Sequence, residues 1–144
     1  MIDVVTQIQI NKAIQEVALY AMSPDNTPLW YVNIKSVEWK TQPPLSVGTQ
    51  IAFKAEFMGR ALAYTYEVTQ LVPGSKLVMQ TSEGPFPMQT TYTFEKISDD
   101  KTKMTLRNAG KPTGFSKLLS PFMAIMMRKA NNNDLMLLKQ ILEG

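Results

Sequence analysis

The sequence predicts an α+β fold in which an antiparallel sheet of about seven strands curves around one long C-terminal helix. Segments with alternating apolar and polar residues follow one another between residues 33 and 109. The links between them are short and rich in turn-forming residues, whereas parallel neighbours would need crossovers of a dozen or more residues. Beyond residue 115 the apolar residues recur at helical spacing up to about residue 142.

The chain begins with a predicted strand over residues 4–10, where apolar and polar side chains alternate. Asn11 is then expected to cap a short helix that reaches about residue 21. Ser23 marks the start of a second helix, with Pro24 in its first turn. Pro28 is expected to interrupt this helix, so that it stays short.

The central region predicts six further strands, separated by turn-forming segments that contain proline, glycine, serine or aspartate. We expect the strands at residues 33–41, 50–57, 60–72, 76–82, 88–97 and 103–109. The final helix follows the Gly-Lys-Pro-Thr-Gly segment at residues 110–114, and Ser116 or Ser120 is expected to cap it.

Alternate residues divide the predicted sheet into an apolar and a polar face. The apolar face comprises Ile51, Phe53, Ala55, Phe57, Leu62, Tyr64, Tyr66, Val68, Leu77, Met79, Met88, Thr90, Tyr92, Phe94, Met104 and Leu106. Lysine, glutamate, threonine and arginine occupy most of the alternate positions. Such a sheet is expected to be covered by helix on one side only.

Length and composition exclude several classes of protein. The 144 residues suit one domain, and 44% hydrophobic with 19% charged residues suits a packed globule. The formal charge of +3 is not concentrated in a basic stripe, so no nucleic-acid partner is expected. With no cysteine and no histidine, zinc, haem and triad chemistry are disfavoured, and no metal or cofactor is expected.

The N-terminal segment MIDVVTQIQI alternates and lacks a basic start, unlike a secretory signal. The most apolar window, residues 118–127, is too short to span a bilayer. We expect a cytoplasmic protein with at most transient membrane contact and an undetermined oligomeric state.

The ordered set of segments resembles the START-like, helix-grip superfamily, and within it the polyketide cyclase/dehydrase and lipid-transport group, also called SRPBCC. The segments that carry the resemblance are SPDNTPLWYVNIKSVEW, SVGTQIAF, MGRALAYTYEV, VPGSKLVM, GPFPMQTTYTFEK and DLMLLKQILEG. The resemblance implies a helix-grip fold over residues 1–144, with a ligand cavity between sheet and helix. It does not imply one activity, because related folds carry many functions.

Three loops are expected to meet at one end of the sheet, because alternate turns of a meander lie together. They present Met58, Phe86 and Phe115, which form a candidate lip for the cavity. An equally weighted alternative is that these side chains fold back onto the core. The candidate ligand-binding residues are Phe53, Phe57, Met58, Tyr64, Tyr66, Met79, Phe86, Met88, Tyr92, Phe115, Phe122, Met123 and Met126. No catalytic residue is predicted.

Asp134 falls in the apolar arc of the final helix, where a carboxyl group would have a raised pKa. The Asn131-Asn132-Asn133 segment is a poor helix former, and the favoured interpretation is that it shifts the helical phase and places Asp134 in water.

The sequence is compatible with three functions. The first is binding, and possibly transport, of a hydrophobic small molecule such as a lipid, isoprenoid or polyketide. The second is a polyketide cyclase or dehydratase activity, in which Tyr64, Tyr66, Tyr92, Glu38 and Asp134 would assist. The third is a protein-interaction module that uses the lip.

Overall fold

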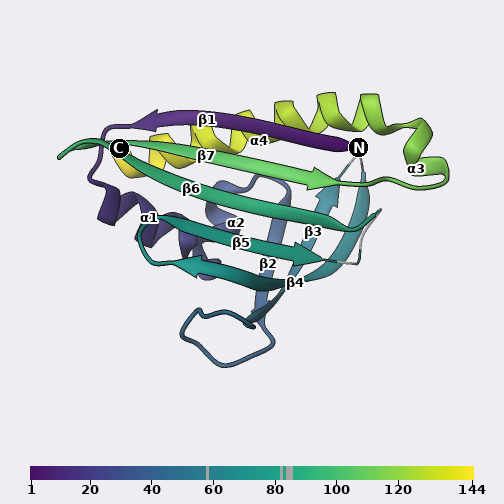
Figure 1. Ribbon diagram of the computed structural model, residues 1–144, viewed down its shortest axis with the longest axis horizontal. Coiled ribbons are helices and arrows are strands. Elements are labelled where there is room, and N and C mark those ends of the chain that lie inside the picture. The colour runs from purple at the N-terminus through teal and green to yellow at the C-terminus, as the bar shows by residue number, and fades with distance from the viewer. Residues whose placement is uncertain (58, 82, 84–85) are drawn as a thin grey trace.

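The computed structural model describes residues 1–57, 59–81, 83 and 86–144, without the side chains of Phe57, Phe115 and Ser116. Seven strands form one sheet in the order β1-β7-β6-β5-β4-β3-β2. Every neighbouring pair is antiparallel, and a long helix runs along the sheet (Figure 1). The predicted α+β, helix-grip architecture is confirmed.

The elements follow the chain in the predicted order. They are β1 (Ile2–Ile10), α1 (Ile14–Met22), a 3-10 turn (Pro24–Asn26), α2 (Thr27–Trp30), β2 (Ile34–Trp39), β3 (Gln50–Phe57), β4 (Arg60–Val72), β5 (Lys76–Thr81), β6 (Met88–Ser98), β7 (Lys101–Gly110), α3 (Phe115–Leu118) and α4 (Ser120–Glu143). The bounds of β3 and β4 agree with the prediction, and the other strands differ from it by one or two residues at one or both ends.

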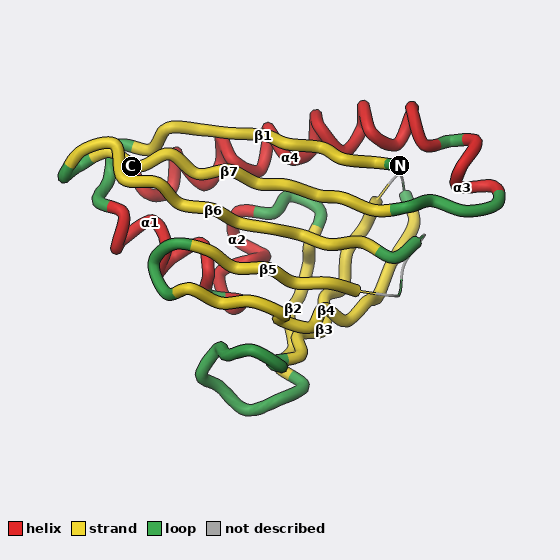
Figure 2. The backbone as a smooth tube through the Cα atoms, in the orientation of Figure 1, coloured by secondary structure: helices red, strands yellow, loops and turns green. Residues whose placement is uncertain are grey.

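The sheet is strongly curved. The register shifts between Val68 and Gln70 in β4, between Ile34 and Ser36 in β2, and between Lys96 and Ser98 in β6. Such bulges bend a strand and increase its twist. In Figure 1, β2 and β3 consequently run across the direction of β6 and β7. This curvature encloses a volume that α1, α2 and α4 close from the concave side (Figure 2).

Helix α4 lies along the edge strand β1 (Figures 1 and 2). Lys139 Nζ donates to the carbonyl of Gln9 over 2.7 Å, and Arg128 donates to the carbonyl of Val5 over 3.1 Å. These bonds occupy carbonyl groups that an open sheet edge would leave unpaired. They fix the position of α4 relative to the sheet, and therefore the space between them.

The predicted helix caps are wrong. Helix α1 begins after Ala13, and the backbone N–H of Asn11 instead donates to Glu143. Helix α4 begins after Leu119 without a side-chain cap, and the Ser120 hydroxyl donates to the carbonyl of Lys117. Pro28 does not end a helix but lies in the first turn of α2, where its missing N–H costs nothing.

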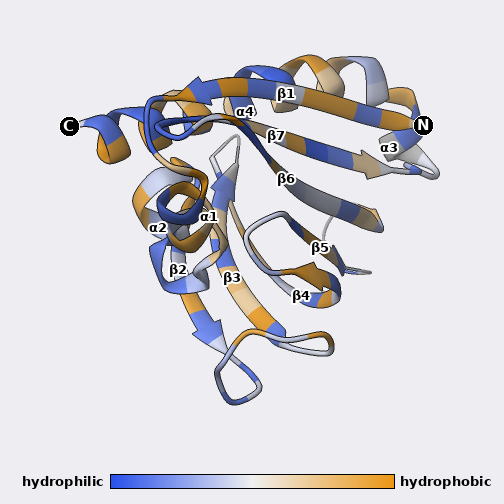
Figure 3. Cartoon of the chain, turned by 60° about the vertical axis from the view of Figure 1, so that its left-hand side comes forward, coloured by the Kyte–Doolittle hydropathy of each residue, from blue (hydrophilic) through white to orange (hydrophobic). Residues whose placement is uncertain are grey.

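Three apolar clusters make up the core. The largest joins α1, α2 and the C-terminal half of α4 to β4–β7, with Trp30, Val17 and Leu138 fully buried. A second is built on β2 and β3, and a third joins β1 and Phe86 to the N-terminal half of α4. Apolar and polar residues alternate along the strands, as Figure 3 shows. The predicted division into two faces therefore holds.

No helix within residues 1–57, 59–81, 83 and 86–144 combines the length and the apolar character needed to cross a membrane.

Candidate functional site

A cavity of about 180 Å³ lies between the sheet and α4, where the three core clusters meet. Phe53 and Ala55 reach it from the cluster on β2 and β3, and Met79 reaches it from the central cluster. Phe86 and Met127 contribute from the third cluster. The helix and the sheet thus do not fill the space between them.

Eight of the thirteen candidate ligand-binding residues line this cavity. They are Phe53, Tyr64, Tyr66, Met79, Phe86, Met88, Tyr92 and Met123. They come from β3, β4, β5, β6, the β5–β6 loop and α4, so the tertiary structure brings together residues that are far apart in the chain. Their contact with a ligand stays a prediction.

The remaining candidates divide into two groups. Phe122 and Met126 lie outside the cavity, and Phe122 is 49% exposed. The reason is helical phase, because Met123, Met127, Ala130 and Asp134 form the face of α4 that lines the cavity. Met58 lies outside the described residues, and so do the side chains of Phe57 and Phe115.

The proposed lip is not formed at Phe86. Its ring is 3% exposed and packs with Ile2 and Val4 beside the cavity. It lies so close to Gly110 that a Cβ atom there would be 2.6 Å from Phe86 Cε2. At this position the alternative interpretation, in which the side chain folds onto the core, is the one observed.

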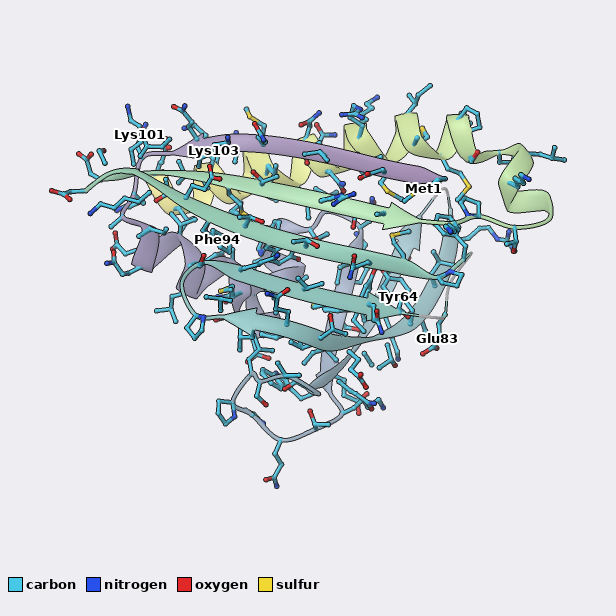
Figure 4. All side chains as sticks on the ribbon, in the orientation of Figure 1. Met1, Tyr64, Glu83, Phe94, Lys101 and Lys103 are labelled. Carbon is cyan, nitrogen blue, oxygen red and sulfur yellow. The ribbon has the colours of Figure 1, made fainter. Side chains whose placement is uncertain are left out.

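One end of the cavity reaches the surface. Glu83 is exposed and lines the cavity, and it accepts a hydrogen bond from the backbone N–H of Thr65 over 3.2 Å. Figure 4 shows Glu83 and Tyr64 at the same end of the sheet, opposite Lys101 and Lys103. From Met123 to Asp134 the cavity wall extends about 16 Å along α4, at 1.5 Å per residue.

Tyrosine hydroxyl groups supply polar contacts inside the cavity. The Tyr31 and Tyr92 hydroxyls are 2.7 Å apart, and Thr90 donates to Tyr66 over 3.3 Å or to Asn108 over 2.7 Å. Burial raises the pKa of the phenols of Tyr31, Tyr64, Tyr66 and Tyr92. All four therefore stay protonated and can donate hydrogen bonds at neutral pH.

Asp134 lies inside the molecule and lines the cavity, with 2% of its surface exposed. The interpretation that placed it in water is wrong, because α4 continues without a break through Asn131, Asn132 and Asn133. Oδ1 accepts a hydrogen bond of 3.0 Å from the backbone N–H of Val32. Burial raises the pKa of the Asp134 carboxyl to about 6, although the bond from Val32 opposes this.

Sequence reasoning missed several polar residues of the cavity, among them Tyr31 and Asn131. Tyr31 directly follows α2, where no periodicity indicates which way a side chain points. Asn131 shares the helical face of Met127 and Asp134, and this spacing was the signal that could have found it. Its side chain is buried, and Nδ2 has no hydrogen-bond acceptor among the described residues.

The charges around the cavity are acidic. Among the lining residues that the structure describes, Glu83 and Asp134 are ionisable carboxyl groups, and none is lysine or arginine. Arg60, Lys111 and Lys117 are exposed and lie outside the lining. Among the residues that the structure describes, no group of three carboxylates is placed to hold a metal ion.

The family of the chain follows from comparison with known proteins. A family model described as "Polyketide cyclase / dehydrase and lipid transport" matches residues 1–143. The chain belongs to this family. No curated protein sequence matches it.

Solved structures share the fold at low sequence identity. A START superfamily protein from Mycobacterium smegmatis is 10% identical, with a TM-score of 0.85 over 98% of this chain and 97% of that chain. An aromatase/cyclase from a Streptomyces species, Zhui, is 11% identical, with a TM-score of 0.83 over 98% of this chain and 93% of that chain. The di-domain ARO/CYC protein BexL is 18% identical, with a TM-score of 0.81 over 99% of this chain. This chain spans 47% of the length of BexL.

Proposed function

We propose that this member of the polyketide cyclase/dehydrase and lipid-transport family binds a hydrophobic small molecule in the cavity between the sheet and α4. The observation that carries the proposal is the unfilled space itself, lined mainly by aromatic, methionine and aliphatic side chains. Burial of apolar ligand surface there contributes about 25 cal/mol per Å² to binding. Residues 1–144 would act as one ligand-binding domain.

The volume limits the ligand. Pockets for drug-sized molecules usually measure about 300–1,000 Å³, whereas an engineered cavity of about 150 Å³ in another protein holds benzene. The cavity of about 180 Å³ therefore suits one ring, or the end of a longer lipid, isoprenoid or polyketide. A longer ligand would extend past Glu83 toward the surface, and methionine side chains such as Met79 and Met123 adapt to varied shapes.

The proposal is tested by native mass spectrometry of the purified protein, followed by extraction of any retained molecule and by titration with toluene. Ala130 lines the cavity, so Ala130→Leu is expected to fill it and to abolish binding. Ala63 is exposed on β4, and Ala63→Leu serves as the control that leaves binding unchanged. A wild-type protein that retains no molecule and does not bind toluene would contradict the proposal.

A second candidate function is catalysis on a polyketide, and the position of Asp134 favours it. A carboxyl group with a pKa of about 6, in the same cavity as the Tyr31–Tyr92 hydroxyl pair, suits proton transfer near neutral pH. Glu38 does not belong to this group, because it is exposed and pairs with Lys40 over 3.4 Å. Turnover of a candidate polyketide thioester with a rate that changes near pH 6, and loss of that change in Asp134→Asn, would support catalysis.

A further inference from the structure

Asn131 and Asp134 occupy neighbouring positions on the cavity wall. They are three residues apart on α4 and both line the cavity, with 5% and 2% of their surfaces exposed. Residues at this spacing on a helix have Cβ atoms about 5–6 Å apart. A ligand group at this part of the wall would therefore lie next to both side chains.

The Asn131 side chain has an unused donor. Its Nδ2 group is buried and has no acceptor in the part of the chain that the structure describes. Buried polar groups in folded proteins are nearly always hydrogen-bonded, so an unpaired donor on a cavity wall calls for an explanation. A ligand that brings an acceptor to this point would provide it.

The Asp134 side chain has unused acceptor capacity. A carboxylate offers two oxygen atoms with about four lone-pair sites. Among the described residues, Val32 is the one donor recorded for it, and no lysine or arginine lines the cavity. Its raised pKa agrees with a buried carboxyl group that lacks a cationic partner.

We propose that the ligand carries a neutral hydroxyl group that lies between these two side chains, donating its proton to Asp134 and accepting a hydrogen bond from Asn131 Nδ2. This inference rests on the proposed function, because it requires that the cavity holds a ligand. The hydroxyl group satisfies both residues with a single atom. A phenol or an alcohol with one apolar ring matches both this pairing and the cavity volume.

Other polar groups satisfy only part of the site. An ammonium group pairs with Asp134 but offers no acceptor to Asn131. A ketone accepts from Asn131 but brings no proton to Asp134. A carboxylate ligand meets the like charge of Asp134 where no cationic side chain is present among the described lining residues.

The pairing also predicts a pH dependence. The titratable groups that face Asp134 are the phenols of Tyr31, from the segment after α2, and of Tyr92, from β6. Both phenols have raised pKa values and stay neutral, as do those of Tyr64 and Tyr66 on β4. Asp134, with a pKa of about 6, changes charge between pH 5 and 8, whereas these four phenols do not. Glu83 lies at the open end of the cavity. Because hydrogen bonds to an ionised carboxylate are stronger, hydroxyl binding is expected to weaken as Asp134 becomes protonated.

The experiment compares phenol with toluene, which has the same ring without the hydroxyl group. Dissociation constants are measured by NMR titration at pH 7.5 for the wild type, Asn131→Leu and Asp134→Asn. Asp134→Asn keeps an oxygen for the Val32 N–H but places an NH2 donor where the carboxylate offered its second oxygen to the hydroxyl proton. Asn132→Leu, at an exposed position on the same helix, is the matched control.

The readout is the preference for phenol, expressed as the ratio of the toluene to the phenol dissociation constant. We expect this ratio to fall at least tenfold in Asn131→Leu and in Asp134→Asn and to stay unchanged in Asn132→Leu. Circular dichroism and thermal melting show that each variant is folded. For the wild type, the ratio is also expected to fall between pH 7.5 and pH 5.

The outcomes separate this inference from the proposed function. If toluene and phenol both bind and the ratio is the same in all four proteins, the hydroxyl site is refuted while ligand binding by the cavity stands. If neither probe binds the wild type, the proposed function fails, and the hydroxyl site fails with it.

Discussion

The backbone N–H of Val32 donates a hydrogen bond of 3.0 Å to Oδ1 of Asp134, across 102 positions of the sequence. This bond ties the segment between α2 and β2 to the middle of α4. It also fixes the carboxyl group on the cavity wall, beside the hydroxyl pair of Tyr31 and Tyr92. The contact between α4 and the segment before β2 and the acid–base behaviour of Asp134 therefore depend on the same short stretch of α4.

The first prediction concerns pH and Asp134. Its pKa is about 6 in the folded protein and about 3.9 in an unfolded chain. The folded state thus binds the proton more tightly, so the stabilisation from this group is full below about pH 4 and is lost as the pH rises through 6. Asp134→Asn has no carboxyl group at this position and does not lose this stabilisation. As the pH rises from 4 to 7, its free energy of unfolding should therefore increase by on the order of 2 kcal/mol relative to that of the wild type.

Urea denaturation at several pH values measures this difference. Asp3 and Glu143 have lowered pKa values and act in the opposite direction, but both proteins contain them, so their effects cancel. Asn132→Leu, which changes no ionisable group at an exposed position of α4, is the control and should show no such trend. A difference between Asp134→Asn and the wild type that does not change with pH would show that Asp134 titrates normally.

The second prediction concerns the hydroxyl pair. Tyr31→Phe or Tyr92→Phe breaks the 2.7 Å bond and leaves the other hydroxyl group buried without its partner. Each single change should lower the free energy of unfolding by about 1–3 kcal/mol, and the double change should cost less than the sum. A double-mutant cycle by urea denaturation measures the coupling. Tyr64→Phe is the comparison, since no hydrogen bond of its hydroxyl is recorded among the described residues, and strictly additive losses would disprove the coupling.

The third prediction concerns the anchoring of α4. Leu138 is fully buried in the largest core cluster, so Leu138→Ala should lower the free energy of unfolding by about 2–5 kcal/mol. Met136 is two residues earlier on the same helix and is 51% exposed. Met136→Ala should change the stability by less than about 1 kcal/mol. Equal losses in the two variants, measured by chemical denaturation, would mean that α4 does not pack as described.

The fourth prediction concerns the close approach at the end of β7. A Cβ atom on Gly110 would lie 2.6 Å from Phe86 Cε2 and 2.7 Å from the carbonyl oxygen of Pro87. Gly110→Ala should therefore lower the free energy of unfolding by about 1–3 kcal/mol. The cost should be smaller in a Phe86→Leu background, which removes the ring but not the carbonyl group. Thermal melting of the wild type, the two single variants and the double variant measures the cost in each background. An unchanged cost in the Phe86→Leu background would exclude the ring as the cause.

Local sequence patterns determined the strands and their faces. Alternation places Ile51, Phe53 and Ala55 on one side of β3, and the structure buries all three. Turn-forming residues such as those at 73–75 mark where strands end, because their conformational preferences act within a few residues. Seven of the eight candidates that line the cavity followed from strand alternation or helical spacing, whereas Phe86 was proposed from its place in a loop, and the cavity itself was implied by the family resemblance.

Only the tertiary structure decided how large the cavity is and which polar groups meet inside it. The placement of Asp134 depended on α4 remaining helical through three asparagines, since packing overrides their weak helix propensity. Phe86, in the β5–β6 loop, packs inward where Gly110, at the end of β7, leaves room for its ring. Such outcomes depend on the curvature of the sheet and on how closely α4 approaches it. These are long-range distances that no local pattern encodes.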